Sequence, residues 1–248
     1  MPYQFATERP DYSDLASGRV FYSLPGHPAF PVRLASEIFQ RCLAQRRAAG
    51  ASEPPVLYDP CCGAAYLLSV VAYLHGPSIR AIVGSDVDPT AVKLAGRNLE
   101  LLTADGIDRR IGELTTDLAR YGKDSHRQAL GIARKIRERI ARMPRITSRV
   151  FQADAGNPAD MQRGFSGSKV DLVITDIPYG RHSEWGGKLH NVPHPARTML
   201  DALLGNLSPT GLVAVVSDKA QKISHEKFLR VERFQIGKRQ IVILKPVA

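Results

Sequence analysis

Apolar runs alternate with amphipathic stretches along the chain from residue 55 onward. The apolar runs are PVLYDP, RAIVGSD, RVFQAD, VDLVITD and LVAVVSDK, and the amphipathic stretches between them include AAYLLSVVAYL, PTAVKLAGRNLELL and PARTMLDALLGNLSPTG. Short strands that alternate with helices are typical of a mostly parallel sheet with helices on both faces. We therefore expect an α/β fold with a doubly wound sheet.

The two ends of the chain add to this core. The pair FLRVERFQIG and RQIVILKPV predicts an antiparallel hairpin at the edge of the sheet. Residues 29–49 predict an amphipathic helix before the first strand, and the stretch AGASEPP links the two. We expect an N-terminal helical segment over residues 1–54 and a core over residues 55–248.

A long insertion interrupts the alternation between residues 104 and 148. More than forty residues separate the helix that ends near Leu102 from the strand at Val150, whereas a compact α/β unit usually needs a connection of about 2 to 6 residues. Within the insertion, the apolar residues of RQALGIARKIRERIARM recur at helical spacing, and Arg and Lys occupy many of the other positions. We expect an inserted basic helical arm.

The insertion also carries most of the net charge. The chain has 34 Lys and Arg against 24 Asp and Glu, a net charge of +10. Residues 109–149 alone hold twelve basic and four acidic side chains, which accounts for +8 of that total. Such a concentrated positive field indicates a polyanionic partner, and we expect nucleic-acid contacts from Arg127, Arg134, Lys135, Arg137, Arg139 and Arg142. The alternative is a solvated basic helix that only packs on the core.

Four of the expected strands end at an aspartate, namely Asp59, Asp86, Asp154 and Asp176. Ligands of open α/β sheets bind beyond the carboxyl ends of the strands. The loop after Asp59 lacks the GxGxxG spacing that cradles a pyrophosphate, and a carboxylate at the position of Asp86 accepts both hydroxyls of a ribose. Each aspartate alone could be a helix N-cap, but the four together favour a nucleoside ligand that has no phosphate and carries positive charge.

Four motifs, taken as a set, resemble those of the class I methyltransferases that use S-adenosyl-L-methionine. LYDPCCGAAY is similar to the family's first motif, VGSDVDP to its acidic ribose motif, QAD to the motif whose aspartate meets the adenine amino group, and TDIPYG to the Asp/Asn-Pro-Pro-Tyr/Phe motif of enzymes that methylate base nitrogens. The resemblance implies a Rossmann-like fold, S-adenosyl-L-methionine as cofactor, and cofactor contacts from Asp59, Cys61, Gly63, Asp86, Asp88, Asp154 and Asp176. Ala65 and Ile177 depart from the family's usual glycine and proline without removing a required side-chain group.

Within this class, the chain most resembles the avilamycin-resistance rRNA guanine methyltransferases in its size, its basic insertion and the sequence TDIPYGRHSEW. The resemblance implies methylation of a guanine base nitrogen of large-subunit (23S) ribosomal RNA, and resistance to ribosome-targeted antibiotics of the avilamycin type. Ribosomal RNA is then the expected partner of the basic arm. The alternatives are a non-catalytic RNA-binding protein on the same fold, a nicotinamide-dependent oxidoreductase, which the missing phosphate loop disfavours, and a methyltransferase for base nitrogens of DNA or tRNA.

The tetrapeptide Asp176-Ile177-Pro178-Tyr179 has groups that suit methylation of a base nitrogen. The lone pairs of such nitrogens are delocalised into the ring, so an enzyme must hold the nitrogen in line with the methyl donor and accept its protons. Asp176 can accept one hydrogen bond, and Pro178 holds Ile177 extended so that the Ile177 carbonyl is a second acceptor. Tyr179 offers a ring on which the base can stack. We expect these four residues to be catalytic; the alternative is a plain turn between a strand and a helix.

The loop 181–197 that follows is long and holds the only tryptophan, Trp185, together with Arg181 and Lys188. We expect these three residues to grip RNA. The histidines of this loop stand among prolines that disfavour a helix, and the three cysteines of the chain show no CxxC spacing, so no metal site is expected.

The chain shows no pattern of a membrane protein. No apolar run approaches the roughly 18 residues that a membrane span requires, and the first residues, MPYQFATERPDYSD, are polar and acidic. We expect a cytoplasmic monomer that makes no membrane contact.

Overall fold

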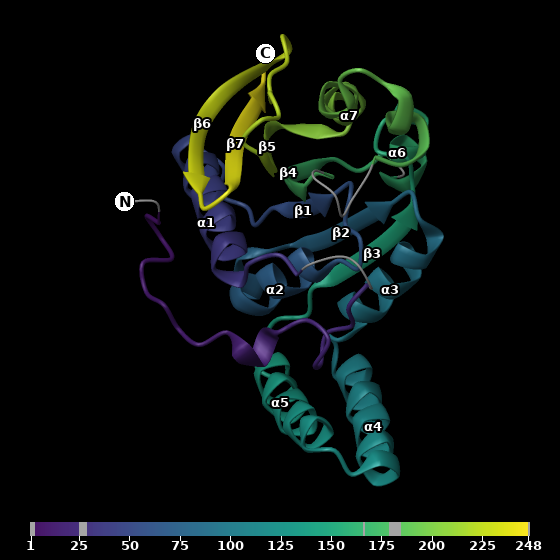
Figure 1. Cartoon of the computed structure of the whole chain (residues 1–248). Coiled ribbons are helices and arrows are strands. Elements are labelled where there is room, and N and C mark those ends of the chain that lie inside the picture. Colours follow the sequence, from purple (N-terminus) through teal and green to yellow (C-terminus); the bar gives the residue numbers. More distant parts are fainter. Residues whose placement is uncertain (1–2, 25–28, 166, 179–184, 248) are drawn as a thin grey trace.

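The computed structural model of the chain describes residues 3–24, 29–165, 167–178 and 185–247. Within these residues, a seven-stranded sheet has the order β3-β2-β1-β4-β5-β7-β6 (Figure 1). The strands are β1 (Val56–Asp59), β2 (Ala81–Asp86), β3 (Thr147–Gln152), β4 (Val170–Asp176), β5 (Leu207–Asp218), β6 (Phe228–Ile236) and β7 (Arg239–Pro246). The first five strands are parallel, and β7 runs antiparallel to both β5 and β6. The fold predicted from the sequence, a mostly parallel sheet with an antiparallel C-terminal pair, is confirmed.

Helices cover both faces of the sheet. The α-helices of the described residues are α1 (Val32–Ala48), α2 (Tyr66–His75), α3 (Pro89–Glu100), α4 (Ala104–Tyr121), α5 (Asp124–Ile140), α6 (Pro158–Phe165) and α7 (Pro195–Leu204), of which α4 and α5 project away from the sheet (Figure 1). Figure 1 shows α2 and α3 on one side of the sheet and α6 and α7 on the other. Each side has its own cluster of buried hydrophobic side chains. Among the described helices, none is long and apolar enough to cross a bilayer.

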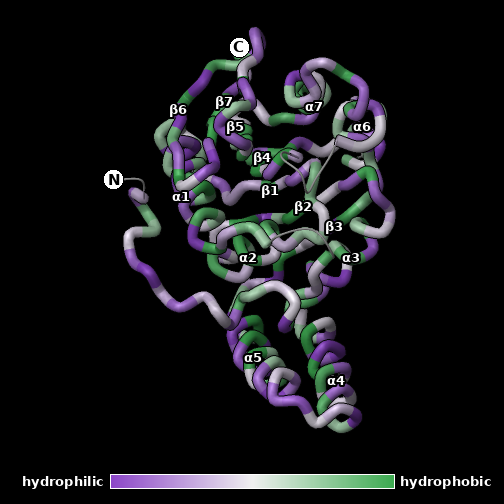
Figure 2. The backbone as a smooth tube through the Cα atoms, in the orientation of Figure 1, coloured by the Kyte–Doolittle hydropathy of each residue, from purple (hydrophilic) through white to green (hydrophobic). Residues whose placement is uncertain are grey.

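The strands differ in burial according to their place in the sheet. In the central strand β4, every residue except its two aspartates is buried. The edge strand β3 instead exposes Thr147, Ser148 and Arg149, and polar or charged side chains on an edge hinder pairing with another chain. Figure 2 shows the same distribution, with hydrophobic positions gathered around β4 and β5.

Helices α4 and α5 form a hairpin that extends away from the sheet (Figure 1). Thr103 caps the start of α4, because its Oγ1 accepts a hydrogen bond from the backbone N–H of Gly106 at 3.1 Å. Gly122 ends α4 with a φ of 62°, a left-handed conformation that glycine adopts without steric cost. The apolar face of α5 is buried. The sequence predicts a helix in the second half of this insertion, and the structure adds α4 in the first half.

The N-terminal segment is fastened to α1 through the buried carboxylate of Glu37. The backbone N–H groups of Gln4, Phe5 and Ala6 donate to this carboxylate at 2.7 to 2.9 Å, and Arg41 donates to it from the next turn of α1 at 2.7 Å. Burial acts to raise the pKa of Glu37, but the hydrogen bonds outweigh burial and lower this pKa from its usual value. Glu37 therefore remains charged at neutral pH and anchors the segment.

Candidate functional site

Three aspartates meet at one edge of the sheet, where adjacent strands end. β1 lies between β2 and β4, and Asp59, Asp86 and Asp176 are the last residues of these three strands. Asp154 follows the neighbouring strand β3, whose last residue, Gln152, pairs with Asp86. The structure thus brings together the strand-end carboxylates that the sequence singles out.

Asp59 is the most deeply buried of these aspartates, with 3% of its surface exposed. Burial raises the pKa of Asp59 to about 7, and the charges of Asp86 and Asp176 act in the same direction. The backbone N–H of Cys61 donates to its Oδ1 at 3.0 Å and opposes this shift. Near neutral pH the Asp59 carboxyl is therefore divided between its neutral and charged forms, and a cation bound beside it would favour the charged form.

The loop after β1 is tied to the end of β2 through Asp86. The backbone N–H of Gly63 donates to Oδ2 of Asp86 at 2.8 Å, and the backbone N–H of Asp88 donates to Oδ1 at 3.0 Å. A β-carbon at Gly63 would meet no atom within 4 Å, so the backbone is open to a ligand at this point. Ala65 has a φ of 55°, a conformation that costs a residue other than glycine about 1 to 2 kcal/mol. The glycine usual at this position in class I methyltransferases would avoid that cost.

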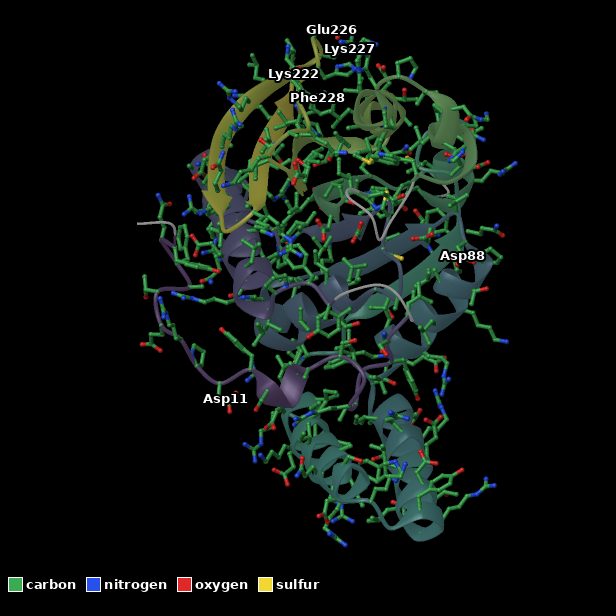
Figure 3. All side chains as sticks on the ribbon, viewed as in Figure 1. Asp11, Asp88, Lys222, Glu226, Lys227 and Phe228 are labelled. Atoms are coloured by element: carbon green, nitrogen blue, oxygen red, sulfur yellow. The ribbon has the colours of Figure 1, made fainter. Side chains whose placement is uncertain are left out.

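Two of the expected cofactor contacts also have structural partners. Asp88 caps α3 by accepting a hydrogen bond from the backbone N–H of Thr90 at 2.8 Å, at the place that Figure 3 labels. Oδ1 of Asp154 accepts from the backbone N–H of Gly156 at 2.8 Å, and its Oδ2 accepts from that of Lys188 at 2.5 Å. Asp154 thereby holds the 3-10 turn Gly187–Asn191 close to the strand ends, a contact for which the sequence gives no signal.

The segment 176–178 is held in place by β5 and by the loop that follows β5. The backbone N–H of Ile177 donates to the carbonyl of Val216 at 3.1 Å, and the Ile177 residue is 1% exposed. The carbonyl of Pro178 accepts a hydrogen bond from Nε2 of Gln221 at 3.3 Å. Tyr179, the expected stacking residue, lies outside the described residues, as does Arg181.

Gln221 is a site residue that the sequence does not reveal. It stands in the loop after β5 and is positioned by Gln240, a residue of β7 that is 2% exposed. Nε2 of Gln240 donates to the carbonyl of Asp218 at 2.8 Å and to the carbonyl of Gln221. Gln221 and Gln240 thus link β7 to the segment that follows β4, and neither belongs to a recognisable motif.

The two described residues of the expected RNA grip in loop 181–197 differ in exposure. Trp185 is partly buried and packs against the hydrophobic cluster on the α6 and α7 side of the sheet. Its indole Nε1 is buried, with no hydrogen-bond partner in the part of the chain that the structure describes. Lys188 is exposed, so of the two only its side chain is freely presented at the surface.

The basic residues expected to bind RNA from the hairpin fall into two groups. Those of the first group are engaged within the protein: Arg127 by Asp124, Lys135 by Asp14, Arg137 by Asp108, and Arg139 by the carbonyls of Tyr73 and Leu74. Arg134 and Arg142 form the second group, since both are exposed and have no ion pair among the described residues. Arg139 also has no carboxylate partner among the described residues, but its hydrogen bonds hold it against the core, so Arg134 and Arg142 are the freely presented cations of this set.

Comparisons with known proteins agree on one family. Residues 1–239 match the family model described as rRNA methyltransferase AviRa. The chain is 42% identical over 245 residues to the 23S rRNA (guanine(2535)-N(1))-methyltransferase of Streptomyces viridochromogenes, which covers 98% of this chain and 95% of that protein. Two structures of the rRNA methyltransferase AviRa from the same organism, at 2.4 and 1.5 Å, are 40% and 39% identical and match with a TM-score of 0.86, covering 98% of this chain and 96% of each of those chains.

Proposed function

Because the chain belongs to the AviRa family of rRNA methyltransferases, we propose that it transfers a methyl group from S-adenosyl-L-methionine to N1 of a guanine in 23S ribosomal RNA. A relative that is 42% identical is named for this activity at guanine 2535. The observation that carries the proposal is the meeting of Asp59, Asp86 and Asp176 at adjacent strand ends. A methyl group on N1 changes the hydrogen-bonding edge of the guanine, and we include in the proposal that this change weakens an antibiotic bound at that base.

The chemistry of the strand-end residues fits the cofactor. When bound, S-adenosyl-L-methionine supplies an electrophilic methyl group on a positively charged sulfur. Asp86 is the proposed acceptor for the ribose hydroxyls, because it is the carboxylate at the end of β2 and lies beside the loop that follows β1. Asp154 is assigned to the adenine amino group and Asp59 to the positive charge, while Cys61, Gly63 and Asp88 form the remaining contacts.

On the side of the base, Asp176 and the carbonyl of Ile177 are the proposed acceptors. N1 of guanine carries a proton at neutral pH, so its methylation requires a group that accepts this proton. We assign that role to Asp176, and we assign the exocyclic amino group of the base to the Ile177 carbonyl. The hydrogen bonds to Val216 and from Gln221 fix the segment before the base arrives, which preorganises both acceptors. Tyr179 keeps its proposed role as the stacking ring.

Arg134, Arg142 and Lys188 are the proposed contacts to RNA phosphates, because all three are exposed cations. Such contacts supply affinity and orientation, while sequence is read at the bases. Arg127, Lys135 and Arg137 contribute less in this proposal, since each would have to leave an aspartate.

Incubation of the purified chain with 23S rRNA and radiolabelled S-adenosyl-L-methionine tests the proposed function. We expect label in the RNA and a single reverse-transcription stop, because a methyl group on N1 blocks the pairing edge of guanine. Parallel reactions with tRNA and with DNA distinguish the substrate class. An absence of label in 23S rRNA, or label in one of the other two substrates alone, would refute the proposal.

Replacement of Asp86 by Ala is expected to weaken binding of S-adenosylhomocysteine by about 1 to 3 kcal/mol, because the ribose hydroxyls lose a charged acceptor. Titration calorimetry measures this affinity. Asp105→Ala, which removes an exposed carboxylate from α4, is the control and should bind as the wild type does. An Asp86→Ala protein with wild-type affinity would mean that the ribose lies elsewhere.

Cofactor binding is expected to release protons near pH 7. The pKa of Asp59 stands at about 7 in the free protein, and a bound sulfonium lowers it, so Asp59 loses its proton on binding. Affinity should therefore rise as pH increases through 7 and level off above it. Calorimetry at pH 6.5 in buffers of different ionisation enthalpy measures the release, which should be smaller with S-adenosylhomocysteine, because that ligand has no sulfonium, and should vanish in Asp59→Asn. Equal release by wild type and Asp59→Asn would contradict this assignment.

A further inference from the structure

A cavity lies between the start of α7 and the loop 219–227, which connects β5 to β6. Its volume is about 360 Å³, and pockets that hold small ligands measure roughly 300 to 1,000 Å³. Its lining includes Pro193, His194, Pro195, Arg197, Lys222 and Ile223. Among the described residues that line it, none is assigned above to the cofactor or to the methylated base.

One side chain connects this cavity to the segment that receives the base. Gln221 lines the cavity, and its Nε2 donates to the carbonyl of Pro178 at 3.3 Å. Pro178 in turn follows the two proposed acceptors, Asp176 and Ile177. The cavity is therefore a neighbour of the methyl-transfer site and is separate from it.

The two walls of the cavity, the start of α7 and the loop 219–227, are fastened to each other by side-chain contacts. The buried ring of His225 lies with Nε2 at 3.1 Å from Oδ1 of Asp201, a residue of α7. Nδ1 of His225 accepts a hydrogen bond from the backbone N–H of Lys227 at 3.0 Å, and Nζ of Lys227 reaches Asp201 at 3.3 Å. Glu226 in the loop also pairs with Arg197 of α7. These contacts fix the walls before any ligand binds.

The lining combines apolar and cationic groups. Pro193, Pro195 and the largely buried Ile223 present apolar surface. Lys222 is exposed and has no ion pair among the described residues, and Figure 3 shows it at the same end of the molecule as Glu226 and Lys227. A ring can lie against such an apolar surface while a phosphate lies near the cation, which is the chemistry of a nucleotide.

We propose that this cavity binds the nucleotide next to the methylated guanine in the RNA strand. This inference rests on the proposed function. A base that enters a methyl-transfer site must leave its stack, and this displacement draws the adjacent nucleotides onto the protein surface. The hydrogen bond from Gln221 to the carbonyl of Pro178 places the cavity beside the segment that carries the two proposed acceptors.

Two substitutions test the proposal through the KM for 23S rRNA. Lys222→Glu reverses the charge of the cavity, and Ser224→Trp fills the cavity from another lining residue without changing its charge. Each is expected to raise this KM by about tenfold, since contacts to one nucleotide are lost, while kcat and the affinity for S-adenosylhomocysteine stay within about twofold. Arg47→Glu, an equal charge change at an exposed residue in the last turn of α1, is the matched control and should leave KM within about twofold. The cofactor affinity also verifies that each variant is folded.

Photocrosslinking provides a second readout with the wild-type protein. A 23S rRNA fragment with a photoreactive nucleotide beside the methylated guanine should crosslink to peptides that contain residues 193–197 or 221–224. Wild-type KM values in both Lys222→Glu and Ser224→Trp, or crosslinks that map only elsewhere, would overturn the proposal and leave the proposed function intact. If the wild-type protein does not methylate 23S rRNA in the same assay, the proposed function fails and this inference fails with it.

Discussion

Asp176→Ala is expected to reduce the rate of guanine methylation by a factor on the order of 10² or more, the size of loss seen when one preorganised polar group is removed from a transition state. The proposed role of Asp176 is to accept the N1 proton, which is needed most as the new N–C bond forms. The loss should therefore appear in the rate, while the affinities for RNA and for S-adenosylhomocysteine change only weakly. Single-turnover methylation with saturating RNA measures the rate directly.

Two further variants of the chain make this test specific. Asp176→Asn keeps the size of the side chain and one oxygen acceptor but loses the charge, so its rate should fall between those of Asp176→Ala and wild type. Asp105→Ala removes an exposed carboxylate from α4 and should methylate at the wild-type rate. A folded Asp176→Ala protein that binds both ligands and methylates as fast as wild type would rule out the proposed mechanism.

The parts of the site that could be predicted from the sequence lie where strands end. A buried parallel strand reads as a continuous apolar run, so the polar residue that stops the run marks the carboxyl edge of the sheet. Asp59, Asp86 and Asp176 are found in this way, and the structure places all three at the ends of adjacent strands. The adjacency follows from strand order, which the class I methyltransferase resemblance implies and periodicity alone does not.

The contacts that could not be predicted join side chains to the backbone of distant loops. Asp154 accepts a hydrogen bond from the backbone of Lys188, and Gln221 donates to the carbonyl of Pro178. Neither contact requires a particular residue type at its backbone partner, so neither leaves a signal in the sequence. Both depend on the tertiary placement of the 3-10 turn Gly187–Asn191 and of the loop 219–227 near the strand ends.

The start of β5 also differs from the expectation. The sequence places the stretch around LSPTG after a helix and begins the strand only at LVAVVSDK, whereas β5 already begins at Leu207. Leu207 pairs with Val170 of β4, and the register shifts before Leu172 pairs with Leu212. Pairing with β4 extends the strand through a proline, and such an irregularity accommodates a residue without a backbone N–H.

The charge of the hairpin could be predicted from the sequence only in part. The sequence identifies the insertion as strongly basic, but it does not reveal which cations are neutralised. Arg127, Lys135 and Arg137 each pair with an aspartate. Two of these aspartates, Asp14 and Asp108, lie outside α5. Reversal of these charges would break contacts within the protein, so a fair test of RNA binding must use cations that have no such partner.

A triple charge reversal at Arg134, Arg142 and Arg145 is therefore expected to weaken binding of 23S rRNA by about a hundredfold or more, since each lost phosphate contact costs affinity and restores bound counterions. All three side chains are exposed, and none has an ion pair among the described residues. The plot of log affinity against log salt concentration should lose about one unit of slope for each arginine that contacts a phosphate. Affinity for S-adenosylhomocysteine should stay at its wild-type value, because the hairpin lies outside the proposed cofactor site.

The matched control reverses three exposed cations of β6 and β7, which lie at the side of the sheet opposite β3. These cations are Arg230, Arg233 and Lys245. The control makes the same change in net charge, so it separates contacts made by the hairpin from a general attraction between a basic protein and RNA. We expect this control to retain most of the affinity and most of the salt slope. Equal losses in both triple variants would show that net charge alone attracts the RNA, and a wild-type slope in the first triple variant would mean that Arg134, Arg142 and Arg145 do not contact phosphates.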